Sequence, residues 1–418
     1  MTSRRGTRAA RRGRCAPGGG ALAASLLVSL LALPATAAGQ GTLASYGTVS
    51  VGPLYETLEF GDGVLQPGLT SGTDVVVRRA SQLTIPFAVT YPVTRDWTLD
   101  IAGARAEGEV ELGSADPALG GARRYRLSGT TDVRMRATGR VVGDNLLVTL
   151  GVSWPTGAFS LDREELSALR VLGAPALGFQ MPAVSVGRSG TAGLVLTRQV
   201  AGWAWALGGS YEVRGRYNPV QAFAAGIPDP DFDPGDAAHL SLGAEGMIGP
   251  HVMTISTSAD LFTGDELRAA GTESAIAAVE LGPIYTAEWQ LRFGTRRFRE
   301  LTLYAIDRYR TRYEQDGVRI PGSDANYLDV GLRAVRRIGA RVDLLAALHA
   351  RHQTGLEVDS TVATAATAAG GLTLGLSRAI GTVIVQPWVR GQFGRLDAAG
   401  ARVSVSGFAG GLALGGRF

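Results

Sequence analysis

Four histidines are the side chains best suited to act as general bases in this chain, at His239, His251, His349 and His352. A serine nucleophile or an activated water needs such a base within hydrogen-bond reach. No His-x-Ser pairing occurs, and Gly187-Arg188-Ser189-Gly190 lacks the full Gly-x-Ser-x-Gly pattern of a nucleophile elbow. We therefore expect a protein that is not an enzyme.

The acidic run 228–236 (PDPDFDPGD) is the stretch whose residue types suggest a metal-binding site. Its aspartates alternate as in a calcium-binding loop, but its glycine is misplaced for an EF-hand and its prolines interrupt the loop. A solvated surface loop stiffened by proline explains the run better. We expect no metal and no other cofactor.

Apolar residues alternate with polar ones over many segments, which is the side-chain period of a β-strand. The segment Trp203 to Asn218 shows this best, because one face is apolar and aromatic while the other carries small and charged residues. Aromatic side chains at both ends of one apolar face are typical of the two girdles of a membrane β-barrel. The predicted girdle residues are Trp203, Trp205, Tyr211, Tyr217 and Phe418.

The final segment, Val403 to Phe418, alternates in the same way and ends on an aromatic residue. Its apolar or glycine face could meet lipid if the last strand of a closed barrel paired with the first. It is similar to the C-terminal signature that the barrel-assembly machinery recognises in bacterial outer-membrane proteins. That machinery and the lipid are therefore expected partners. An edge strand of a soluble sandwich is the alternative.

Residues 1–37 resemble a secretory signal peptide, with a basic start, an apolar core at Ala21 to Leu33 and a small-x-small cleavage site at Ala35-Thr36-Ala37. Cys15 lies inside this leader, so the mature chain would have no cysteine. The whole chain has 41 basic and 37 acidic side chains; without the six leader arginines, 35 face 37. A slightly acidic mature protein gives no support to nucleic-acid binding.

Short and long connections alternate along the chain, as the periplasmic turns and extracellular loops of outer-membrane barrels do. No apolar run after the leader is long enough for a membrane helix. We predict an all-β fold, a transmembrane antiparallel barrel of about 14–16 strands covering residues 74–418. Residues 38–73 form either the first strand or a plug; the first choice favours 16 strands.

The polar face of the predicted strands would line the bore of such a barrel. Its charged members are the pore-lining candidates Arg134, Arg136, Arg140, Glu212, Arg214, Arg216, Arg308, Arg310, Arg312 and Arg333. Charged rings set ion selectivity in pores, so one hypothesis is a cationic lumen that mildly prefers anions. The alternative, which we favour, is that these arginines pair with carboxylates across strands and keep the lumen polar.

Two short stretches resemble a known family. Gly129 to Arg134 (GTTDVR) and Leu150 to Gly157 (LGVSWPTG) are similar to a hairpin of the FadL-like transporters, which include those associated with aromatic-hydrocarbon (meta-pathway) degradation. The resemblance implies an outer-membrane channel for hydrophobic compounds, commonly plugged by an N-terminal segment. It identifies no ligand-binding residue here.

The loop 158–182 contains a predicted helix, with Asp162 as its cap, Glu165 three residues on and Gly173 as its end. It could gate a pore mouth or capture an apolar solute, or it could fold inward as a passive constriction or pack on neighbouring loops. The loop 219–236 has no predicted role. The sequence thus favours an exported outer-membrane channel for passive diffusion of small, including hydrophobic, solutes. The alternative is a structural or surface-interaction barrel with a closed lumen.

Overall fold

A computed structural model describes residues 46–65, 75–114, 123–143, 145–158, 160–173, 177, 179, 184–219, 229–268, 275–357, 364–398 and 401–418. The predicted signal peptide at 1–37 lies outside these ranges and stays a prediction. The same holds for residues 38–45 and 66–74 of the predicted N-terminal segment.

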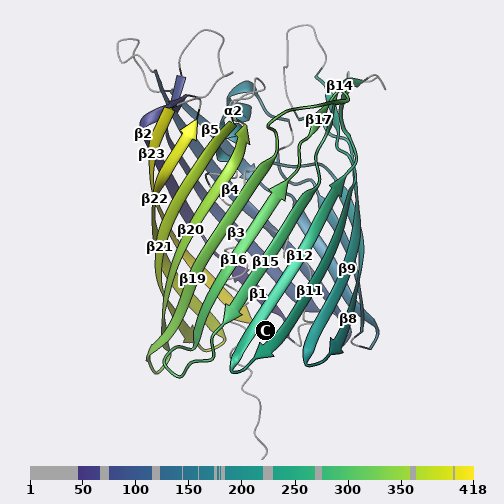
Figure 1. The fold of residues 1–418 in the computed structure, drawn as a ribbon, viewed down its shortest axis with the longest axis vertical. Helices are drawn as coiled ribbons and strands as arrows, with labels where there is room; N and C mark the ends of the chain where they lie inside the picture. Colours follow the sequence, from purple (N-terminus) through teal and green to yellow (C-terminus); the bar gives the residue numbers. More distant parts are fainter. Residues whose placement is uncertain are drawn as a thin grey trace, which may run out of the picture. The chain divides into compact units, whose positions relative to one another are not determined.

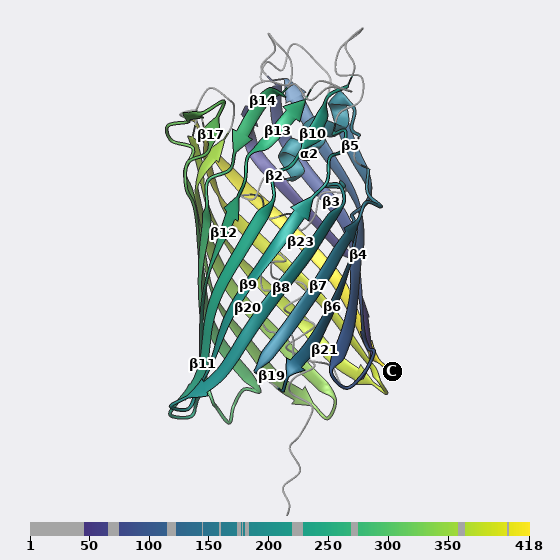
Figure 2. The ribbon, with the colours of Figure 1, turned by 90° about the vertical axis from the view of Figure 1, so that its right-hand side faces the viewer.

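Most described residues belong to one antiparallel sheet that closes into a barrel (Figures 1 and 2). Its strands are β1 (Thr48–Val51), β2 (Leu54–Leu65), β3 (Val75–Pro92), β4 (Trp97–Ser114), β5 (Arg123–Thr130), β6 (Val133–Val142), β7 (Leu146–Trp154), β8 (Ser189–Val200), β9 (Trp203–Arg214), β11 (Ala237–Ile248), β12 (His251–Phe262), β15 (Ile284–Arg292), β16 (Glu300–Arg310), β19 (Ala325–Gly339), β20 (Val342–Glu357), β21 (Thr364–Ile380), β22 (Val383–Ala398) and β23 (Ala401–Arg417).

Two pairs of these segments are halves of single strands. Both β1 and β2 lie between β3 and β23, and both β5 and β6 pair with β4. The barrel therefore has 16 strands and closes where β23 meets β1 and β2. The predicted antiparallel barrel is confirmed, and Thr48 to Leu65 form its first strand.

The outward face of the barrel is apolar, which inverts the arrangement of a soluble protein. Leu194, Leu207 and Leu240 are each more than half exposed on it. The inward face is mostly polar or small, as at the completely buried Thr84, apart from a buried apolar cluster that includes Val110 and Leu127. On β3 the outward apolar positions run from Leu83 to Val93, about 25 Å along the barrel axis for a tilted strand. This is the height of a hydrocarbon core, so the barrel spans a membrane.

A smaller sheet and one helix lie at the end of the barrel that carries the long connections, while short hairpins close the other end (Figures 1 and 2). These elements are α2 (Arg163–Leu172), β10 (Asp231–Asp233), β13 (Asp265–Arg268), β14 (Ala275–Glu280), β17 (Glu314–Gln315) and β18 (Val318–Arg319). Among the described residues no helix is both long and apolar enough to cross a membrane.

Adjacent residues of β11 provide a test of the two faces. Leu242 points outward and is 43% exposed, whereas the hydroxyl of its neighbour Ser241 lies on the inward face near Gly208. We expect Leu242→Arg to lower the free energy of unfolding in lipid vesicles by about 2–4 kcal/mol, because it places a charge in the hydrocarbon layer. Ser241→Arg should change it little, and equal losses in urea titrations would contradict the assignment of the faces.

Candidate functional site: the interior of the barrel

The fourth strand of the barrel contains a one-residue bulge at Thr131–Asp132. On its N-terminal side Thr130 of β5 pairs with Arg105 of β4, whereas on its C-terminal side Arg134 of β6 pairs with Ala102 of β4. One extra residue moves every following side chain to the other face. Unbroken alternation from Tyr125 to Val141 would put Arg126 and Arg134 on one face, and the bulge makes that reading of the sequence wrong. Arg126 points outward and Arg134 points inward.

The side chain of Asp132 fastens both ends of the connection between β7 and β8, residues 155–188. It is 5% exposed; its Oδ1 accepts a hydrogen bond from the Gly157 N–H at 3.3 Å and its Oδ2 accepts one from the Val186 N–H at 2.9 Å. Thr156 adds two bonds, donating to the Thr131 carbonyl and accepting from the Val133 N–H. We call these contacts the Asp132 clasp.

Gly157 is required at the clasp for steric reasons. A Cβ at this position would lie 2.6 Å from the Thr130 carbonyl oxygen and 2.8 Å from the Ser185 backbone nitrogen. Both obstacles are backbone atoms and cannot rotate away. Asp132 and Gly157 belong to the two stretches that resemble the FadL-like hairpin, and the structure joins them across 25 residues of chain.

Helix α2 begins at the predicted cap. The Asp162 carboxylate accepts hydrogen bonds from the Glu164 and Glu165 N–H groups, both at 2.8 Å, and the Glu165 side chain accepts from the Asp162 N–H, which completes a capping box. The helix ends at Gly173, as predicted.

The apolar face of α2 packs against the inner wall of the barrel. Ala168 and Leu172 are at most 1% exposed, in a cluster with Val110 of β4 and Leu127 of β5. Leu127 points inward because of the bulge. Of the arrangements predicted for this loop, the structure therefore shows the inward one, in which the connection fills part of the bore.

The same connection reaches the opposite wall. The Arg351 side chain, on β20, donates a hydrogen bond to the Leu177 carbonyl at 3.1 Å. Strands β7 and β20 are eight strands apart in the ring of 16, which is half its circumference. The described residues of the β7–β8 connection are thus held at two opposite sides of the barrel wall.

Several buried polar side chains surround Arg351, which holds the Leu177 carbonyl. Arg351 also approaches Gln392 of β22 at 3.4 Å, and Arg390 of the same strand forms a 2.6 Å ion pair with Glu56 of β2. The Glu56 side chain is 3% exposed. On β19, Tyr327 donates to Asp329 at 3.2 Å. Nothing in the sequence distinguishes Arg351 from other arginines on alternating strands, so sequence analysis missed it.

Most pore-lining candidates lie on the inner wall, on β6, β9, β16 and β19. Arg136 pairs with Asp100 at 3.0 Å, and Arg214 pairs with Glu212 at 3.4 Å. Further inward-facing candidates are Arg134, Arg140, Arg308, Arg310 and Arg333, of which Arg333 pairs with Glu300 at 3.5 Å and Arg310 donates to the Ser323 carbonyl.

Two candidates lie beyond the barrel strands. Strand β9 ends at Arg214, not at Asn218 as predicted, and Arg216 pairs with Asp233 of β10 at 2.9 Å. Arg312 follows the end of β16 and pairs with Asp324 at 3.1 Å. The ten candidates therefore do not form one continuous ladder, and their contribution to selectivity remains a hypothesis.

The predicted girdle residues Trp203, Trp205 and Tyr211 share the outward face of β9. Phe418 is 64% exposed, stacks on Tyr91 with ring centroids 6.4 Å apart, and exchanges two backbone hydrogen bonds with Gly47. Tyr217 differs, because it follows the end of β9 and packs edge-on against Phe232. It lies in the loop region rather than on the strand face.

Two aspartates of the acidic run near β10, Asp233 and Asp236, have cationic or hydrogen-bonding partners. Asp233 pairs with both Arg216 and Arg268, and the Tyr211 hydroxyl donates to Asp236 at 2.7 Å. That bond, with a second from the Arg214 N–H, holds the pKa of Asp236 below its ordinary value, whereas burial raises the pKa of Asp265. In the described part of the chain no group of three or more potential ligand side chains is placed to hold a metal.

The histidines occupy separate environments. His239 Nδ1 lies 2.6 Å from Asp260 Oδ1 on the inner wall, and Ser210 is opposite His239 in the strand register. No hydrogen bond between Ser210 and His239 is found among the described residues. His251 accepts from the Gly294 N–H at the end with the short hairpins. His239 is thus paired with a carboxylate, and the described residues bring no serine hydroxyl into hydrogen-bond contact with it.

Comparisons with known proteins return solved barrels. No family model and no curated protein matches the chain. An outer-membrane channel from Pseudomonas putida F1 is 12% identical, with 91% of this chain and 100% of that chain covered and a TM-score of 0.33. A mutant of the TodX monoaromatic hydrocarbon channel is 9% identical, with 94% of each chain covered and a TM-score of 0.45. OccK2 of Pseudomonas aeruginosa in complex with glucuronate is 10% identical, with 91% and 99% covered and a TM-score of 0.46. Such low values say nothing about the solute.

The Asp132 clasp leads to a prediction about Asp132→Asn. The amide nitrogen would face a backbone N–H donor, so one attachment should be lost at a cost of about 1–3 kcal/mol. We expect hydrogen exchange of the Gly157 and Val186 amides to accelerate while the barrel stays folded. Asp100→Asn, which removes an inward carboxylate with no contact to the connection, should leave these amides protected. Unchanged protection in Asp132→Asn would contradict the clasp.

Proposed function

We propose that this protein is an outer-membrane channel through which small solutes diffuse passively, narrowed by its own β7–β8 connection. The observation that carries the proposal is the path of that connection, from the Asp132 clasp to Arg351 on the opposite wall. A segment held inside the bore of a barrel narrows the path that a solute can take through it.

The location follows from the two faces of the barrel. A closed barrel leaves no unpaired backbone edge in the lipid, and its exposed apolar face requires a bilayer. The predicted leader at residues 1–37 would export the chain, and the strand ending at Phe418 would be recognised by the barrel-assembly machinery. The outer membrane is the compartment where these features meet.

The solute path is expected along the wall opposite the filled part of the bore. The inward positions of β8, β9, β11 and β12 are mostly small or hydroxylated: Gly193, Ala204, Ala206, Gly208, Ser241, Gly243, Ser256 and Ser258. Such a wall leaves room and makes few strong contacts, so it suits small solutes, hydrophobic ones included. A structural barrel with a closed lumen is the second candidate, and the Arg351–Leu177 contact favours it.

Single-channel conductance in planar bilayers distinguishes the two candidates. We compare the wild type with a variant in which residues 159–183 are replaced by a short glycine linker, leaving Gly157 and Val186 in place. We expect small wild-type steps and steps several-fold larger in the variant, because the part of the bore that α2 occupies is cleared. Silence from both proteins, with folded barrels shown by heat-modifiable migration, would contradict the channel and favour the structural barrel.

The attachment at Arg351 can be tested separately. Arg351→Gln removes the guanidinium that holds Leu177, so we expect noisier current and more frequent large openings. Arg308→Gln is the matched control, an inward arginine on β16 without a described contact to the connection. Identical traces for the wild type and Arg351→Gln would show that this contact does not restrict the bore.

Ion selectivity tests the predicted role of the arginines. Three of the inward-facing candidates have described carboxylate partners, Asp100, Glu212 and Glu300. We therefore expect a reversal potential near zero in a KCl gradient. A clear anion preference, lost on Arg134→Gln, would instead support the cationic lumen.

A further inference from the structure

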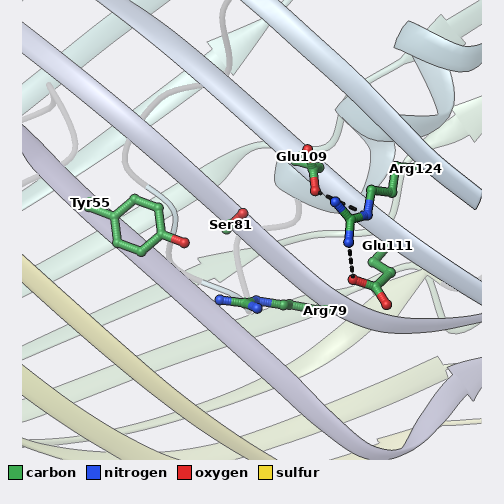
Figure 3. Close-up of a pocket in the computed structure, with 6 residues that line it drawn as sticks. All are labelled: Tyr55, Arg79, Ser81, Glu109, Glu111 and Arg124. Carbon is green, nitrogen blue, oxygen red and sulfur yellow. Dashed lines mark ion pairs between the residues drawn. The ribbon is translucent and has the colours of Figure 1, made fainter. Parts of the chain in front are cut away.

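The outer wall of the barrel carries a shallow cleft that the channel does not use. It is lined by Tyr55, Arg79, Ser81, Glu109, Glu111 and Arg124, from β2, β3, β4 and β5 (Figure 3). The strand register puts these side chains on the outward face, since Tyr55 lies opposite Leu83 and Glu111 lies opposite both Arg79 and Arg124. Arg124 points outward because the bulge at Thr131–Asp132 reverses the alternation of β5.

The cleft begins where the apolar band ends. Going along β3 from the short-hairpin end, the outward side chains Tyr91, Phe87 and Leu83 are all exposed and apolar or aromatic. The next two outward positions are Ser81 and Arg79. Since the run from Val93 to Leu83 already covers about 25 Å, the cleft lies at the level of the lipid headgroups on the side of the long connections.

The arginines of the cleft keep donor capacity for another ligand. Arg79 Nε donates a hydrogen bond to the Thr57 hydroxyl at 3.1 Å. The ion pairs of the two arginines are long, since Arg124 lies 3.6 Å from Glu109 and 3.8 Å from Glu111, and Arg79 lies 4.0 Å from Glu59. The side chains of Arg124 and Arg79 are 58% and 45% exposed. Guanidinium groups bind phosphate through two parallel hydrogen bonds, which are stronger than such loose exposed pairs.

The two carboxylates of the cleft, Glu109 and Glu111, indicate which groups the ligand carries beside its phosphate. Glu109 and Glu111 would repel a bare phosphate, but they can accept hydrogen bonds from hydroxyl groups beside it. A headgroup with both phosphates and sugar hydroxyls matches this mixture, whereas a simple phosphodiester matches the arginines alone. Tyr55, at the edge of the apolar band, can lie between the headgroup and the acyl chains.

We propose that this cleft binds the phosphorylated sugar headgroup of a glycolipid in the outer leaflet. Phosphate accepts from Arg79 and Arg124, and sugar hydroxyls donate to Glu109 and Glu111. The proposal rests on the outer-membrane location proposed above, but not on the barrel conducting solutes. A purely solubilising ion-pair network is the competing explanation.

A matched network elsewhere on the outer wall serves as the control. Arg402 pairs with Asp397 at 2.8 Å, and Arg395 lies 3.6 Å from the same carboxylate, on β22 and β23 beyond the exposed Phe393. It has the same number of arginines in a comparable outward position. It differs from the cleft in having one carboxylate where the cleft has two, Glu109 and Glu111.

The experiment compares glycolipid bound to the full-length protein after extraction from outer membranes in mild detergent. Native mass spectrometry gives the number of phosphorylated glycolipids per barrel for the wild type, for Arg79→Gln/Arg124→Gln and for Arg395→Gln/Arg402→Gln. We expect about a tenfold loss in the first variant and wild-type binding in the second. Equal binding in all three proteins, or equal loss in both variants, would overturn the proposal.

A second measurement identifies the ligand. Protein refolded without lipid is titrated in micelles with diphosphorylated lipid A, with phosphatidylglycerol and with inorganic phosphate. Preference for lipid A, lost in Arg79→Gln/Arg124→Gln, supports the proposal. Equal affinity for phosphatidylglycerol, or competition by inorganic phosphate alone, would show charge attraction without glycolipid recognition and overturn it. Conductance of both variants should match the wild type, so the channel is tested independently.

Discussion

The carboxylate of Asp132 is the contact on which the interior of this barrel depends. A short, rigid acidic side chain accepts from two backbone N–H groups that are far apart in sequence, so it fixes the distance between both ends of the β7–β8 connection. Because the anion is buried, its hydrogen bonds must be kept, and the connection cannot swing out without exposing or orphaning the charge. The connection is thus attached to the wall close to both of its ends.

The bulge beside Asp132 has effects on both sides of the wall. Inside, it turns Leu127 towards the bore, where it forms part of the apolar seat of α2. Outside, it turns Arg124 and Arg126 towards the headgroup level, where Arg126 pairs with Glu109 at 2.9 Å. A regular strand would have placed the arginines under α2 and the leucine outside. One inserted residue therefore makes both the seat and the charged outer surface possible.

The barrel could be predicted from sequence because its alternation is long and repeated, and because turns and loops alternate in length. The bulge could not, since Thr131 and Asp132 have no local turn signal and the register is set by β4 and by Gly157. Alternation also placed Arg216 and Tyr217 on a barrel strand, although β9 ends at Arg214. The alternating pattern continues past Arg214 because these two residues pair with β10 instead. Pairing of individual arginines, such as Arg351 with the Leu177 carbonyl, depends on which strands face each other and leaves no periodic trace.

The closure of the sheet between its first and last strands has a consequence for how the molecule forms. Thr48 pairs with Arg417, so the contacts that complete the ring join residues separated by nearly the whole described chain. Such contacts carry a large loop-closure entropy and form late, which makes folding slow. Until β23 arrives, β1 and β2 present an open hydrogen-bonding edge to water. A chain whose barrel has not yet closed is therefore prone to aggregate. Protection by a binding partner during export matters most for the first strands of the chain, because their partner β23 is made last.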